Sequence, residues 1–92
     1  MKPVKLFHFE SCPYCRDAKK WMRELKEEYP ELAKVNVEMI DERLEPDKVD
    51  AFIMAGNSYY YVPSFFVGGV KAHEGAASKD IVEKVLRSAL EE

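Results

Sequence analysis

The spacing of apolar and polar residues predicts a strand followed by a long helix in the first third of the chain. Residues 4–9 are an apolar run with little polar interruption, which is typical of a strand buried on both faces. Beyond residue 13 the apolar positions recur every three or four residues, the period of an amphipathic helix. Pro30 disfavours helical geometry at the residue before it, so we expect the helix to end there. The apolar face of this helix comprises Ala18, Trp21, Met22, Leu25 and Tyr29.

The middle of the chain predicts a second strand and a second helix. Residues 35–40 alternate between apolar and polar side chains, which is the period of a strand. Pro46 and Asp47 suit the first turn of a helix, and Gly56 suits its end. We expect this helix to turn inward Val49, Phe52 and Ile53.

The last third of the chain predicts a hairpin and a final helix. Residues 64–67 and 70–73 have the pattern of strands, and Gly68-Gly69 between them fits a tight turn. Ser78 is a suitable N-cap for the last helix. Its inward face comprises Ile81, Val82, Val85, Leu86, Ala89 and Leu90.

The predicted order of elements is β-α-β-α-β-β-α, so the expected fold class is α/β. The first half is a βαβ unit, in which the two strands should be parallel and joined by a right-handed crossover. Ninety-two residues suit one compact domain, and we expect a single domain over residues 1–92.

Composition and charge narrow the functional classes. Hydrophobic residues make up 47% of the chain, enough to bury a core, so disorder is not expected. The formal charge is −3 and the cations are interspersed with carboxylates, which argues against a nucleic-acid partner. No apolar run approaches the ~20 residues that span a bilayer, and the first residues lack the apolar segment of a secretory signal. We therefore expect a cytoplasmic monomer with no nucleic-acid or membrane partner.

The chain has two cysteines, Cys12 and Cys15, between the first predicted strand and the first predicted helix. Because structural disulfides are rare in the cytosol, this position favours redox chemistry. Free backbone N–H groups and the helix dipole favour an anion at the first cysteine, and the thiolate is the nucleophile of disulfide exchange. The second cysteine, one turn on, is near enough to attack a mixed disulfide. We expect Cys12 to be the exposed, reactive thiol and Cys15 the shielded one. A zinc site completed by His8 and His73 is the alternative use of the pair.

The run Cys12-Pro13-Tyr14-Cys15-Arg16, followed by Ala18-Lys19, resembles the active site of dithiol glutaredoxins. Val62-Pro63, about fifty residues later, resembles the cis-proline of that family. The whole chain fits the thioredoxin fold, so the resemblance implies a four-stranded mixed sheet flanked by three helices.

The resemblance implies a thiol–disulfide oxidoreductase that reduces protein or small-molecule disulfides. Cys12 would be the nucleophile and Cys15 the resolving thiol, while Val62 and the cis-bonded Pro63 would present backbone to a bound glutathione or peptide. We also expect exposed rings at Tyr14 and Tyr61 to contribute to substrate binding. We expect no metal ligands and no tightly bound cofactor, with glutathione as a candidate co-substrate.

Three departures from the glutaredoxin pattern concern the binding of glutathione. Phe9 stands where the family usually has Lys or Arg, and Tyr61 stands where it usually has Thr. After the hairpin, residues 73–77 replace the family's Gly-Gly and Asp-containing turn and are more similar to thioredoxin. Because Phe9 cannot pair with a carboxylate and Glu74 would repel one, we expect weak glutathione binding.

These departures leave two alternatives to a glutaredoxin-like reductant of protein disulfides. One is a thioredoxin-like reductant that receives electrons from a flavin thioredoxin reductase instead of glutathione. The other, from a different functional class, is a module that binds glutathione and an iron–sulfur cluster.

Overall fold

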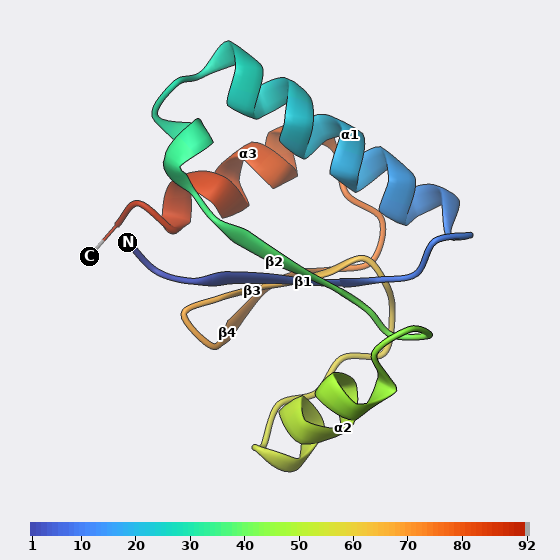
Figure 1. Ribbon diagram of the computed structural model, residues 1–92. Helices are drawn as coiled ribbons and strands as arrows, with labels where there is room; N and C mark the ends of the chain where they lie inside the picture. The colour runs from blue at the N-terminus through green and yellow to red at the C-terminus, as the bar shows by residue number, and fades with distance from the viewer. Residues whose placement is uncertain (92) are drawn as a thin grey trace.

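The structure, a computed structural model, describes residues 1–91 and is built on one mixed sheet (Figure 1). The strand order is β2-β1-β3-β4, comprising β1 (Val4–His8), β2 (Val37–Asp41), β3 (Ser64–Val67) and β4 (Val70–Glu74). β1 and β2 are parallel, whereas β1 pairs with β3 and β3 with β4 in antiparallel fashion. The predicted thioredoxin fold is therefore confirmed, including the parallel βαβ unit.

Helices cover both faces of the sheet (Figure 1). α1 (Pro13–Glu28) and α3 (Lys79–Ser88) lie on one face, and α2 (Pro46–Met54) lies on the other. A short 3-10 helix, η1 (Leu32–Lys34), follows α1 and was not predicted. Within residues 1–91 no helix combines the length and the apolar character needed to cross a bilayer.

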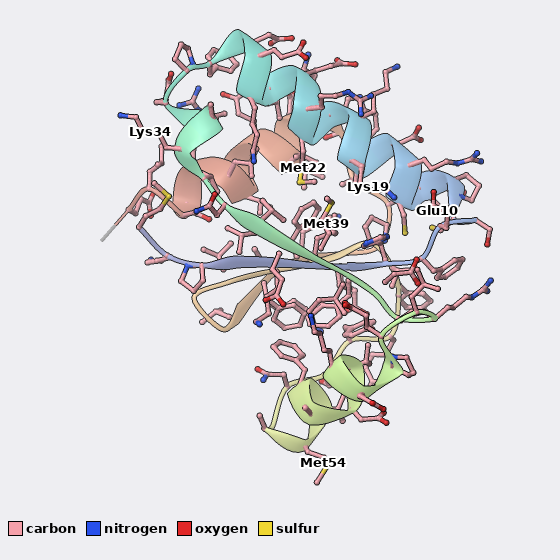
Figure 2. All side chains as sticks on the ribbon, viewed as in Figure 1. Glu10, Lys19, Met22, Lys34, Met39 and Met54 are labelled. Atoms are coloured by element: carbon pink, nitrogen blue, oxygen red, sulfur yellow. The ribbon has the colours of Figure 1, made fainter. Side chains whose placement is uncertain are left out.

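The larger core lies between the sheet and the α1–α3 layer. The predicted inward face of α1 is confirmed, and Figure 2 shows Met22 pointing from α1 toward the sheet. Ser78 caps α3 as expected, since its hydroxyl accepts a hydrogen bond from the Ile81 N–H at 3.2 Å. The residues buried here on the two helices are Ala18, Met22, Leu25, Val82, Val85 and Leu86, and Ala89, the C-cap of α3, joins them.

The smaller core attaches α2 to the opposite face. Phe52 packs its ring 4.7 Å from the rings of both Phe7 and Phe66, and Val49 packs beside it. The prediction that Ile53 also points inward is wrong, because its side chain is 47% exposed. Successive helical residues are ~100° apart, so a helix that touches the sheet along one narrow stripe leaves the neighbour of Phe52 in solvent.

The hairpin between β3 and β4 contains one feature that the sequence did not reveal. Gly68 and Gly69 have positive φ values of 57° and 82°, which explains the predicted tight turn. Beyond the turn, Ala72 has no partner in the pairing of β3 with β4 and forms a β-bulge. The bulge shifts the register so that Glu74 lies opposite Ser64.

Replacing Phe52 with Ala should lower the free energy of unfolding by about 2–4 kcal/mol, because the lost ring leaves a gap against Phe7 and Phe66. The neighbouring substitution Ile53→Ala is the control and should cost less than about 1 kcal/mol, because that side chain is half in solvent. Urea denaturation followed by circular dichroism measures both losses. Equal losses in the two variants would contradict this packing of α2.

Candidate active site

Cys12 is the N-cap of α1, in the position that the sequence predicted. Its backbone is extended, with φ −83° and ψ 116°, and its Sγ accepts a hydrogen bond from the Cys15 N–H at 3.2 Å. Pro13 occupies the first helical position, where a missing N–H leaves no hydrogen bond unmade. The Cys12 N–H donates to the Phe9 carbonyl at 3.2 Å, which ties the loop to the end of β1.

The two thiols are buried to different degrees. Cys15 has no exposed surface, while Cys12 keeps 5%, so the expectation that Cys12 is openly exposed is wrong although its order relative to Cys15 holds. Burial first, and then the hydrogen bond to the Cys12 sulfur, raise the pKa of the Cys15 thiol to about 12. Cys15 is therefore protonated at neutral pH in the reduced protein.

The Val62–Pro63 peptide bond is cis, as predicted. The Val62 carbonyl oxygen lies 4.0 Å from the Cys12 Sγ, so the loop that carries the cis bond contacts the candidate nucleophile. Pro63 itself is fully buried, and the Ser64 hydroxyl below it donates to the Tyr61 carbonyl at 2.5 Å. Two segments fifty residues apart thus form a single site.

A groove of about 400 Å³ opens beside Cys12. Tyr14, Tyr60 and Tyr61 are 58%, 83% and 71% exposed at this groove. Of the residues predicted to bind substrate, Tyr14, Tyr61 and Val62 line the groove, whereas the buried Pro63 does not. The complete lining consists of Phe9, Ser11, Cys12, Pro13, Tyr14, Glu42, Tyr59, Tyr60, Tyr61 and Val62.

One of the three adjacent tyrosines packs inward. The Tyr59 ring is stacked 4.8 Å from the Phe7 ring, and its hydroxyl donates to a Glu42 carboxylate oxygen at 2.7 Å. Burial first, and then this hydrogen bond, raise the pKa of the Tyr59 phenol. Sequence reasoning missed Glu42, because it directly follows β2 and no local pattern marks its place beside the groove.

Arg43 contacts two residues of the groove lining, Phe9 and Ser11, although it does not itself line the groove. The Arg43 guanidinium lies over the Phe9 ring, 4.1 Å from its centroid, and donates to the Ser11 hydroxyl at 3.3 Å. Asp41 holds the Arg43 backbone, since its carboxylate accepts the Arg43 N–H at 2.9 Å. The fold therefore brings a positive charge to the Phe9 ring through a contact that no local sequence pattern indicates.

Charged groups also surround the end of β1 on the α1 side. The Lys19 ammonium on α1 lies 3.9 Å from the carboxylate of Glu10 in the loop between β1 and α1 (Figure 2). His8 is buried and its Nδ1 has no hydrogen-bond partner. Burial first, and then the charge of Lys19, lower the pKa of His8, so its imidazole is neutral at neutral pH.

The zinc alternative finds no support in the geometry. His73 hydrogen-bonds through Nε2 to the Ala76 carbonyl at 2.9 Å. Across residues 1–91 no group of three His, Cys, Asp or Glu side chains is arranged to hold a metal ion.

We compared the chain with models of known protein families. A family model described as glutaredoxin matches residues 4–71. The chain belongs to the glutaredoxin family. The match includes both cysteines and the Val62-Pro63 pair and indicates a thiol–disulfide oxidoreductase. No curated protein matches the chain.

The pKa of Cys15 can be measured in a Cys12→Ser variant by ultraviolet absorbance of the thiolate. Because burial is the main cause of the raised pKa, we expect titration well above the ordinary range of cysteine even without Cys12. In the native reduced protein, iodoacetamide near neutral pH should modify Cys12 long before Cys15. Titration of Cys15 at an ordinary pKa, or its faster alkylation, would contradict the assignment.

Proposed function

We propose that this glutaredoxin family member reduces disulfides of polypeptide substrates through the Cys12–Cys15 dithiol. The observation that supports the proposal best is the position of the Cys12 Sγ. It caps a helix, lies 4.0 Å from the Val62 carbonyl and opens into an aromatic groove. The helix N-terminus favours the thiolate that disulfide exchange requires.

In the first step the Cys12 thiolate attacks one sulfur of the substrate disulfide. A new S–S bond forms between Cys12 and that sulfur, the substrate S–S bond breaks, and the other substrate sulfur leaves as a thiolate. The Cys15 N–H, 3.2 Å from the Cys12 Sγ, stabilises negative charge on that sulfur before attack and when it leaves again.

In the second step Cys15 resolves the mixed disulfide. Its thiol loses a proton to solvent and the thiolate attacks the Cys12 sulfur, which releases the second substrate sulfur as a thiolate and leaves a Cys12–Cys15 disulfide. The substrate thus gains two electrons, and its thiolates take protons from solvent. An external reductant, either a dithiol or two thiol molecules, returns two electrons to the enzyme.

The groove supports a polypeptide as the substrate. An extended chain can hydrogen-bond to the Val62 backbone in the manner of an added strand, which brings its disulfide next to Cys12. The exposed rings of Tyr14, Tyr60 and Tyr61 offer apolar contacts to the residues that flank the substrate cysteine.

Two variants test the roles of the cysteines. Cys12→Ser should abolish disulfide reduction, because no nucleophile remains in the groove. Cys15→Ser should still attack and should accumulate a mixed disulfide, detectable by mass spectrometry after incubation with a disulfide-containing peptide. Trapping through Cys15 in the Cys12→Ser variant, with none in the other, would reverse the assignment and defeat the proposal.

The electron donor is identified by two NADPH-coupled assays, one through glutathione and glutathione reductase and one through a flavin thioredoxin reductase. We expect the glutathione route to be at least about tenfold less efficient than in glutaredoxins that bind glutathione through a charge-assisted hydrogen bond. High efficiency with glutathione would contradict this expectation and leave the dithiol chemistry intact. A coloured, cluster-containing protein on purification would instead favour the iron–sulfur module.

A further inference from the structure

Glu74, the last residue of β4, holds its carboxylate against three donors. Its Oε2 accepts hydrogen bonds from the backbone N–H of Tyr60 at 2.5 Å and of Tyr61 at 2.9 Å. Its Oε1 pairs with the Lys71 ammonium at 2.6 Å. The bulge at Ala72 makes this contact possible, because it sets the register that brings Glu74 to the Tyr60–Tyr61 loop.

Two consecutive backbone N–H groups and an ammonium are donors with which proteins bind carboxylates and phosphates. Here the anion is a side chain of the same molecule, and 17% of it is exposed. The hydrogen bond from Lys71 first, and then that from the Tyr60 N–H, hold the pKa of Glu74 below its ordinary value. The carboxylate is therefore charged at neutral pH. It occupies a set of donors that could otherwise bind an external anion.

This position adjoins the substrate groove. Tyr60 and Tyr61 supply its N–H donors and also line the groove with Cys12. None of the side chains that line the groove is Lys or Arg, and the one carboxylate among them belongs to Glu42. A substrate at this wall meets aromatic rings, while the N–H groups of both tyrosines are already engaged.

We propose that Glu74 determines substrate specificity by occupying an anion-binding position formed by the Tyr60 and Tyr61 N–H groups and the Lys71 ammonium. The occupied position excludes carboxylates next to the substrate disulfide. The enzyme therefore favours polypeptide disulfides with uncharged flanking residues over anionic disulfides such as glutathione disulfide. This inference rests on the proposed oxidoreductase function and names the substrate class of the same site.

The test compares an anionic and a neutral disulfide in single-turnover oxidation of the pre-reduced protein. Glutathione disulfide and 2-hydroxyethyl disulfide are the two probes, and the measured quantity is the ratio of their second-order rate constants. Glu74→Ala should raise this ratio at least about tenfold, the gain expected when a carboxylate acquires a charge-assisted hydrogen bond. Arg43 is present in every variant, so its charge cancels in the comparison.

Three further variants separate occupation of the position from simple charge repulsion. Glu74→Gln removes the charge but keeps an oxygen on the N–H groups, so the ratio should change by less than about threefold. Adding Lys71→Met to Glu74→Ala should remove most of the gain. Glu38→Ala breaks the exposed Lys5–Glu38 pair, 3.0 Å long and outside the groove lining, and should leave the ratio unchanged.

A binding measurement provides a readout independent of turnover. Inorganic sulfate added to Glu74→Ala should shift the amide NMR signals of Tyr60 and Tyr61, whereas the native protein should show no such shift. The proposal is overturned if the rate ratio in Glu74→Ala stays at its native value, or if Glu74→Gln raises it tenfold. The Gln variant keeps the proposal falsifiable should the Ala variant not fold. Failure of native protein to oxidise with either probe would instead refute the proposed function itself.

Discussion

The antiparallel register of β1 and β3 is the constraint on which the active site depends. Phe7 lies opposite Ser64, so the residue before Ser64, Pro63, reaches the end of β1, where the Cys12 loop begins. The large apolar side chains of both strands are buried, and a slip of one residue would turn them toward the wrong face. The core therefore fixes the register, and the register places the Val62 carbonyl beside the Cys12 sulfur.

Local patterns were sufficient to predict what local geometry determines. The helical period identified Ala18, Met22 and Leu25 as core, and the paired glycines identified the turn, because each feature depends on a few neighbouring residues. The cysteine pair and the cis bond at Pro63 were likewise predictable, through their spacing and the family resemblance.

Features that arise from contacts between distant segments were not predictable. Arg43 stacks on Phe9, and Glu74 binds Tyr60 and Tyr61, only because separate strand ends meet at one edge of the sheet. The bulge at Ala72 has no distinctive local sequence, yet it decides which side chain reaches the tyrosine loop. For the same reason the sequence could indicate that the charge of Glu74 disfavours glutathione binding. It could not indicate that the Glu74 carboxylate is hydrogen-bonded to the Tyr60 and Tyr61 N–H groups. The family match ends at residue 71, before Glu74.

The three-residue spacing of the cysteines links capping and catalysis in one geometric feature. An N-cap side chain accepts a hydrogen bond from the N–H of the second or third helical residue, and the third helical residue here is Cys15. The hydrogen bond from the Cys15 N–H stabilises negative charge on the Cys12 sulfur. The same hydrogen bond holds the resolving cysteine one turn away. Because the helix turns Cys15 into the core, the same spacing keeps its thiol protonated while the N-cap sulfur stays at the groove. The chemical difference between two identical side chains thus follows from their positions in a single helical turn.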